Sequence, residues 1–215
     1  MKKIQTLLFQ NITESEWDDM CAQNCMRTQY FGKNAIIFHM GDMIREIGIV
    51  LSGNINIENI DLWGNKSLLN NICAGQLFAE TYALCKEPIM VNAIAAETSE
   101  ILFLNADILT DFRYENCSWH MKITKNMLHI LLQKNMALAN RIFCTTPKTI
   151  RERLLIYLSS ESSKAKSTTF QIPFNRQELA DYLNLDRSAL SKELGKMRDD
   201  GILRFRKNQF TLFDI

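Results

Sequence analysis

Small polar side chains and cations gather on one side of the segment DRSALSKELGKM, residues 186–197. In a helix, residues three and four positions apart share a face. Two hydroxyls, a lysine and a glycine would then form one face, here called the recognition face: Ser188, Ser191, Lys192 and Gly195. Short hydroxyls let a helix approach a flat anionic surface, and a lysine can reach a guanine edge or a phosphate. The pattern therefore predicts a face that contacts DNA.

Basic and amide side chains surround this face. Arg187 lies at the start of the same segment, where it can reach a base edge or a phosphate. Arg176 and Gln177 open a preceding helix, where N–H groups commonly meet phosphate. Three further cations either contact the DNA backbone or are merely solvated: Lys196, Arg206 and Lys207. The expected DNA-binding residues are Arg176, Gln177, Arg187, Ser188, Ser191, Lys192, Lys196 and Arg206.

Spacings typical of enzymes and preformed metal sites do not occur in the sequence. Three histidines and six cysteines are scattered, without a C-x-x-C or H-E-x-x-H motif. A cupin-like metal enzyme would need clustered His and Glu ligands, and no nucleophile–base pair stands out. We therefore expect no catalytic residue, no metal and no resident cofactor. Most cysteines are interpreted as small buried hydrophobes, with thiol oxidation at an exposed one as an alternative.

The charge of the 215-residue chain is unevenly distributed. Residues 141–215 hold 14 basic and 9 acidic side chains, whereas residues 1–140 hold 11 and 15. A basic C-terminal part suits a polyanion such as double-stranded DNA. No apolar run approaches the roughly 18 residues of a membrane span, and the N-terminus does not match a signal peptide. We expect a cytoplasmic protein that does not contact a membrane.

The recognition face falls in the second of two short predicted helices. Asn175 and Glu178 form a capping box that starts the first helix, and Asp186 caps the second. With the tight turn NLD between them, the two helices form a helix–turn–helix. The stretch ILRFRKNQFTLF, residues 202–213, alternates on both sides of KNQ and predicts a hairpin wing.

The residues before the helix–turn–helix have a different pattern, typical mainly of β-strands. A short helix is predicted over residues 14–30, and residues 31–105 read as short strands punctuated by glycines, typical of an antiparallel β-sandwich or barrel. DLWGNK, residues 61–66, predicts a hairpin tip. The fold class is α+β: an antiparallel β-roll, a long helix and a winged helix–turn–helix.

The long helix is predicted over residues 118–143, which contain no glycine or proline. Side chains at alternating steps of three and four form a seam: Met121, Thr124, Leu128, Leu131, Asn135, Leu138 and Ile142. This spacing is typical of a coiled-coil dimer, in which Asn135 could fix the register. The alternative is a helix packed on its own domain, and Met127, Ile130 and Ala137 supply a second stripe for that contact. We expect a homodimer.

The order of these parts resembles the cyclic-AMP receptor protein/FNR (Crp/Fnr) family of bacterial transcription regulators. The most specific matches are IPFNRQELADYLNLDRSALSKELGKMRDDGIL and GQLFAETYAL before AAETSEILFL. The resemblance implies a homodimer on a palindromic operator, an effector in the β-roll and RNA polymerase as a partner. It also implies base contacts from Arg187, Ser188, Ser191 and Lys192, and phosphate contacts from Arg176 and Gln177.

The chain departs from the family where members bind cyclic nucleotides. Those members carry Gly-Glu and, some ten residues later, an arginine for the cyclic phosphate. Here Ala79-Glu80 stands instead, and EPIMVNA, residues 87–93, contains no cation. An unpaired phosphate in a buried site would be costly, so we expect an effector other than cyclic AMP. The expected uncharged effector pocket comprises Phe78, Glu80, Thr81, Met90, Asn92 and Leu128.

The iron–sulfur cluster of oxygen-sensing members is disfavoured because the cysteine spacing does not match, and a haem bound through His39, His120 or another ligand is disfavoured as well. The predicted boundaries are residues 1–117 for a β-roll sensor domain, 118–143 for a dimerisation helix and 147–215 for a DNA-binding domain. The predicted function is an effector-responsive, DNA-binding transcription regulator. The alternative is a ligand-binding β-roll adaptor that acts through protein partners, with DNA binding weak or lost.

Overall fold

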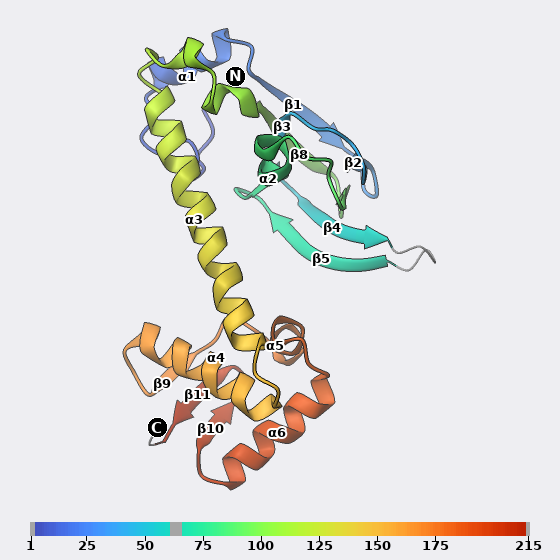
Figure 1. Ribbon diagram of the computed structural model, residues 1–215, viewed down its shortest axis with the longest axis vertical. Coiled ribbons are helices and arrows are strands. Elements are labelled where there is room, and N and C mark those ends of the chain that lie inside the picture. The colour runs from blue at the N-terminus through green and yellow to red at the C-terminus, as the bar shows by residue number, and fades with distance from the viewer. Residues whose placement is uncertain (1–2, 61–65, 214–215) are drawn as a thin grey trace. The chain divides into compact units, whose positions relative to one another are not determined.

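The computed structural model describes residues 3–60 and 66–213. The chain divides into two compact units, Met1–Leu131 and Leu132–Ile215, here called the N-terminal and C-terminal units. The helix α3 (His120–Thr145) runs through the boundary between them (Figure 1). This helix confirms the one predicted over residues 118–143.

The N-terminal unit contains two antiparallel four-stranded sheets, which confirms the predicted β-roll. The first sheet has the order β1-β8-β3-β6, and the second has the order β2-β7-β4-β5. The strands of the first sheet are β1 (Met26–Phe31), β3 (Glu46–Ser52), β6 (Leu77–Phe78) and β8 (Ser99–Asn105). Those of the second are β2 (Ile36–Phe38), β4 (Asn54–Ile60), β5 (Lys66–Cys73) and β7 (Asn92–Ala95). The predicted hairpin tip at residues 61–66 lies almost wholly outside the described residues.

Apolar side chains of β3 and β8 form the centre of this unit. Ile47, Ile49, Leu102 and Leu104 are fully buried. The turn between β3 and β4 requires a glycine, because Gly53 has a φ of +80° and an added Cβ would lie 2.3 Å from the Ser99 hydroxyl. Short helices complete the unit: α1 (Glu14–Ala22), α2 (Glu80–Cys85), and the 3-10 turns η1 (Ala106–Leu109) and η2 (Phe112–Tyr114).

The helix predicted over residues 14–30 is wrong in its second half. The helix α1 ends at Ala22, and Asn24 adopts a left-handed conformation with φ of 51°. Residues 26–31 then form β1, which pairs with β8 along its whole length. Pairing with a strand about 75 residues away outweighs local helix propensity in this segment.

The first turns of α3, with Trp119 just before them, pack into the N-terminal unit through one buried stripe: Trp119, Ile123, Met127 and Ile130. Beside this stripe, Lys122 Nζ lies 2.7 Å from a carboxylate oxygen of Glu16. The Nε1–H of Trp119 donates to Asp19 at 2.6 Å. The ammonium of Lys122 lowers the pKa of Glu16 from 4.5 to about 2. These bonds fasten α1 to the long helix.

The C-terminal unit holds α4 (Ile150–Ala165), α5 (Arg176–Leu183) and α6 (Arg187–Asp199) with a small antiparallel sheet of order β10-β11-β9. Its strands are β9 (Thr169–Gln171), β10 (Leu203–Arg206) and β11 (Gln209–Leu212). The two predicted helices and the hairpin wing are thus confirmed, and β9 adds a third strand that the sequence did not indicate. The predicted capping box of α5 is present, with the Asn175 side chain accepting from the N–H of Glu178.

Candidate nucleic-acid interface

The helix α6 has one fully buried side and one solvent-exposed side. Leu190, Leu194 and Met197 are 0% exposed and join the core with α4 and α5. On the other side the recognition face is accessible, since Ser188, Ser191 and Lys192 are exposed. Around Gly195, an added Cβ would meet nothing within 4 Å, so this part of the helix surface is open.

The start of α6 is fixed by Asp186. One carboxylate oxygen accepts from the backbone N–H of Ala189 at 2.9 Å and from the Ser188 hydroxyl at 2.5 Å. The Ser188 hydroxyl, followed by the Ala189 N–H, lowers the pKa of Asp186. Ser188 therefore stabilises the cap in the free protein, and its hydroxyl must turn away from Asp186 to donate elsewhere.

A pocket of about 650 Å³, here called the cationic pocket, lies beside the start of α6. The first turn of α5, the first residue of α6 and the wing turn meet around it. Its lining comprises Pro173, Asn175, Arg176, Gln177, Glu178, Arg187, Lys207 and Asn208. Arg176, Arg187 and Lys207 line it together with one carboxylate, that of Glu178, and the N-terminal end of α5 adds a partial positive charge. Such a pocket suits a phosphate group.

The Arg176 guanidinium is held against the wing. Its central carbon lies 4.8 Å from the ring centre of Phe205 and 5.2 Å from that of Phe210. Burial lowers the pKa of Arg176. The aromatic pair thus positions a half-desolvated cation at the pocket, where charge pairing is stronger than in bulk water.

Of the three further cations named in the sequence analysis, Lys196, Arg206 and Lys207, one lines the cationic pocket. Lys207 lines the cationic pocket, whereas Arg206 is exposed outside its lining. Lys207 adopts a φ of +54° at the tip of the β10–β11 hairpin, and that turn brings it to the pocket. Lys196 lies 3.6 Å from Glu193, so part of its charge is offset. Gln177 donates from its side chain to Asp181 at 2.8 Å.

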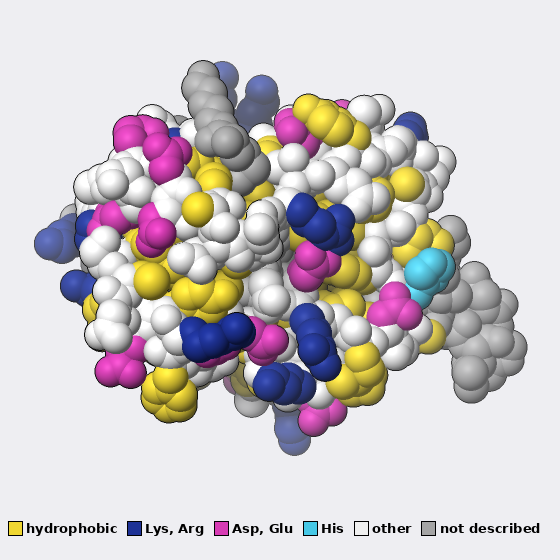
Figure 2. Space-filling model, turned by 90° about the horizontal axis from the view of Figure 1, so that it is seen from above, with side chains coloured by type: hydrophobic (Ala, Val, Ile, Leu, Met, Phe, Trp, Pro, Cys, Tyr) yellow, Lys and Arg dark blue, Asp and Glu magenta, His cyan; other side chains and the backbone are white. Residues whose placement is uncertain are grey.

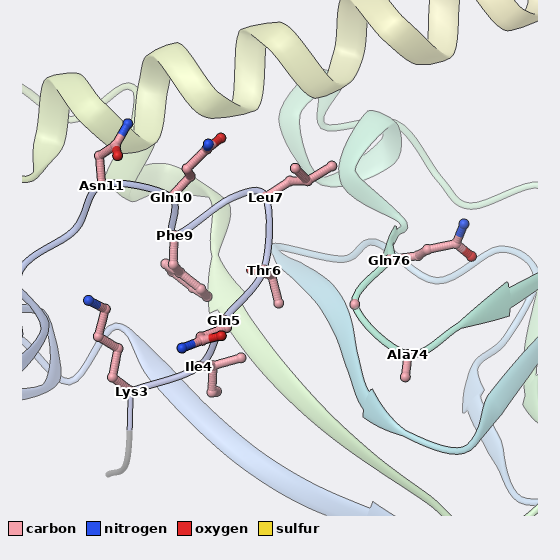
Figure 3. Close-up of a pocket in the computed structure, with 11 residues that line it drawn as sticks. Lys3, Ile4, Gln5, Thr6, Leu7, Phe9, Gln10, Asn11, Ala74 and Gln76 are labelled. Atoms are coloured by element: carbon pink, nitrogen blue, oxygen red, sulfur yellow. The ribbon is translucent and has the colours of Figure 1, made fainter.

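The six residues expected for the effector pocket differ in accessibility. Phe78, Glu80 and Asn92 are buried, and Asn92 accepts from the backbone N–H of Met40 at 2.9 Å. Thr81, Met90 and Leu128 are exposed. A cleft of about 600 Å³ in the same unit has a different lining (Figure 3): Lys3, Ile4, Gln5, Thr6, Leu7, Phe9, Gln10, Asn11, Ala74, Gly75 and Gln76.

The short helix α2 shows how the chain departs from a cyclic-nucleotide site. Ala79 precedes it with a φ of +66°, in the left-handed region that favours glycine. Lys86, the nearest cation, follows the helix and lies 3.8 Å from Asp107. Its side chain is 73% exposed, so Lys86 does not supply a buried partner for a phosphate.

The seam of α3 leaves large apolar side chains in solvent. Met121, Leu128, Leu138 and Ile142 are each more than half exposed, and so are the neighbouring Leu132, Met136 and Phe143. Leu131 is half-buried and Asn135 is exposed. Exposed apolar patches of this kind are in general features of interaction surfaces.

Other candidate chemistry is sparse. Across residues 3–60 and 66–213, no group of three or more His, Cys, Asp or Glu side chains is arranged to hold a metal ion. None of the helices described combines the length and apolar character needed to cross a bilayer.

Burial raises the pKa of Cys25 to about 11, which makes its thiol unreactive. Figure 2 shows the face around α1, where cations and anions are interspersed without a continuous patch of either sign.

Two family models match the chain. A cyclic nucleotide-binding domain matches residues 28–116, and a Crp-like helix-turn-helix domain matches residues 152–215. The Cyclic AMP receptor protein of Thermus thermophilus is 24% identical, over 92% of this chain and 88% of its own length. The Fumarate and nitrate reduction regulatory protein of Vibrio cholerae is 23% identical, over 94% of this chain and 81% of its own.

Solved structures show the same fold. The structure described as CprK complexed with OCPA has a TM-score of 0.61 at 17% identity, covering 94% of this chain and 92% of that one. The catabolite activator protein of Thermus thermophilus has a TM-score of 0.51 at 20% identity, covering 97% and 94%. With both domain models in the expected order, the chain belongs to the Crp/Fnr family of transcription regulators, which are non-enzymatic proteins that bind DNA through a helix–turn–helix and carry an effector-binding domain.

Proposed function

We propose that this protein is an effector-responsive regulator that binds a palindromic operator as a homodimer. One observation carries the proposal: α6 presents an exposed, uncrowded face of hydroxyls and a lysine directly beside the cationic pocket. A recognition helix needs a narrow, non-acidic surface for the major groove and nearby cations for the phosphates that flank it.

The residues divide between these two tasks. Ser188, Ser191 and Lys192 contact base edges, and Arg187 reaches a base edge or the adjacent phosphate. One phosphate occupies the cationic pocket, where Arg176, Gln177 and Lys207 contact it. Lys196 and Arg206 contact the DNA backbone more weakly, because one is paired with Glu193 and both lie outside the pocket lining.

Two copies of the chain associate through the seam of α3. Pairing would cover the exposed apolar stripe, and Asn135 would fix the register of the two helices. In such a dimer the two recognition helices contact half-sites about 34 Å apart, one turn of the duplex. The domain boundaries 1–117, 118–143 and 147–215 follow from these roles.

The N-terminal unit senses a small molecule other than cyclic AMP. Relatives of this fold are described as a cyclic AMP receptor, as a c-di-GMP responsive regulator and as complexed with OCPA, so the scaffold accommodates different ligands. The absence of a cation in residues 87–93 and the pairing of Lys86 with Asp107 both disfavour an anionic phosphate here. As a regulator of bacterial transcription, the protein acts on RNA polymerase in the cytoplasm.

Salt dependence of DNA binding tests the proposal. Duplexes selected from random DNA by the purified protein are titrated by fluorescence anisotropy at several salt concentrations. We expect a palindromic consensus and an affinity that falls steeply with salt, because each neutralised phosphate releases condensed counterions. A flat salt response, or a monomer by sedimentation at micromolar protein, would contradict it. An adaptor that works through protein partners would show neither a consensus nor sensitivity to replacement of Lys192.

A further inference from the structure

The carbonyl end of α5, the first helix of the helix–turn–helix, is bonded to α3. The Nε–H and an Nη2–H of Arg141 donate to the backbone oxygens of Tyr182 and Asp181, each at 3.2 Å. The guanidinium also lies 5.9 Å from the ring centre of Tyr182. The last carbonyls of a helix have no partner within the helix and carry a partial negative charge, so a cation there stabilises the end of the helix.

A second arginine, on α4, bonds the remaining carbonyls at the same end of α5. Arg153, on α4, donates from Nη1 to the backbone oxygens of Leu183 and Asn184 at 3.2 Å, and from Nε to that of Pro147 at 2.7 Å. Four successive carbonyls are therefore shared between the two guanidinium groups. Arg153 acts from within the C-terminal core, whereas Arg141 extends from the long helix.

The last turns of α3 also lie beside α4, since Asn140 and Phe143 line a cleft together with Leu155. Among the described residues, Cys144 is the one side chain of α3 that belongs to the buried core of the C-terminal unit. After Thr145 the chain reaches α4 through residues 146–149. Arg141 thus provides a hydrogen-bonded connection between α3 and α5. It adds to the buried Cys144 and to the covalent linker of residues 146–149.

We propose that Arg141 is a positioning residue through which α3 sets the orientation of the DNA-binding helices. The contact reaches α6 because α5 and α6 pack together as one body, with Ala180, Leu183 and Leu190 fully buried. The proposal rests on the homodimer proposed above. A dimer that must place two recognition helices on two half-sites gains affinity when both are held in advance, whereas one helix on one half-site gains nothing.

The test compares two duplexes. One is the palindrome selected by the wild-type protein, and the other has one half-site scrambled. We expect Arg141→Ala to weaken binding to the palindrome roughly tenfold, equivalent to about 1.4 kcal/mol, while the single half-site is bound within about twofold of wild type. Arg141→Lys should restore part of the loss, because the ammonium keeps the positive charge at the helix end but lacks the planar, forked donors of the guanidinium.

Two control variants separate positioning from charge and from folding. Lys148→Ala removes the same charge from the exposed linker and should leave the ratio of the two affinities unchanged. Arg153→Ala should lower the thermal stability of the C-terminal unit and weaken both duplexes together. An Arg141→Ala protein that matches wild type on both duplexes, or weakens both equally, would overturn the role of Arg141. Wild-type protein without preference for the palindrome would overturn the proposed dimer and this role with it.

Discussion

Two short helices, α6 and α2, occupy the places where this family contacts DNA and effector, and they are built very differently. The helix α6 begins at a side-chain cap from Asp186, buries one apolar side completely and exposes the recognition face on the other. The helix α2 has no side-chain cap, and Ala79 precedes it in a conformation that favours glycine. The helix expected to contact DNA thus has a capped start and an accessible face, whereas α2 begins after Ala79, where the cyclic-nucleotide-binding members that the chain resembles carry glycine. Sensing and DNA binding can thus diverge separately on one fold.

The largest expected effect is a loss of operator affinity when the recognition face is altered. Lys192→Ala should weaken binding to the selected operator by about 1–3 kcal/mol, because a base or phosphate contact is lost without disturbing the core. Affinity is measured by anisotropy at fixed salt. Glu80→Gln, in the α2 region, is the matched variant and should leave DNA affinity without effector unchanged. Equal operator affinity for Lys192→Ala and wild type would show that α6 does not face DNA.

A second prediction concerns the ion pair that fastens α1 to α3. Because Lys122 lowers the pKa of Glu16, the stabilisation is fully present above pH 4.5 and is lost as the pH falls towards about 2. Lys122→Met should remove about 2 kcal/mol of unfolding free energy at neutral pH, with a smaller difference in acid. Urea unfolding followed by tryptophan fluorescence at pH 7 and pH 3 measures it. Lys125→Met, on the exposed side of α3, is the control, and an equal loss there would refute the ion pair.

Gly195→Ala, on the recognition face of α6, should change stability and operator affinity in opposite directions. The free protein should gain about 1 kcal/mol of stability, because alanine favours helix and nothing lies within 4 Å of the new Cβ. Operator affinity should fall, because the methyl group occupies space that the duplex needs. Thermal melting and anisotropy on the same preparation report both, and a stabilised variant with unchanged affinity would place Gly195 away from the DNA.

The smallest predicted effect concerns α2. Ala79→Gly should raise the unfolding free energy by about 1 kcal/mol, since a non-glycine residue at a φ of +66° is strained. Ala83→Gly, inside the same helix, should lower it by a similar amount. Chemical denaturation of both variants measures the pair, and a loss of stability in both would argue against strain at Ala79.

The sequence predicts the C-terminal unit well because its signals are local. The capping box at Asn175 and Glu178, the cap at Asp186 and the apolar stripe of α6 each lie within a few residues of one another. Contacts made over long separations were not predictable. Lys207 reaches the cationic pocket through a hairpin turn, Arg141 bonds carbonyls 40 and 41 residues away, and β1 forms only because β8 pairs with it. The effector stays unidentified for the same reason, since its site depends on segments that meet only in the folded chain.

The bonds between the amino-terminal segment and α3 have a consequence for synthesis on the ribosome. The amide of Asn126 donates to the backbone oxygens of Leu8 and Gln10, both at 2.9 Å, across more than a hundred residues. Residues 3–12 leave the ribosome before the strands of both sheets, and Asn126 leaves it only after them. The bonds from Asn126 to this segment therefore form only after α3 has been synthesised, which makes docking of the segment on α3 a late step in the folding of the N-terminal unit.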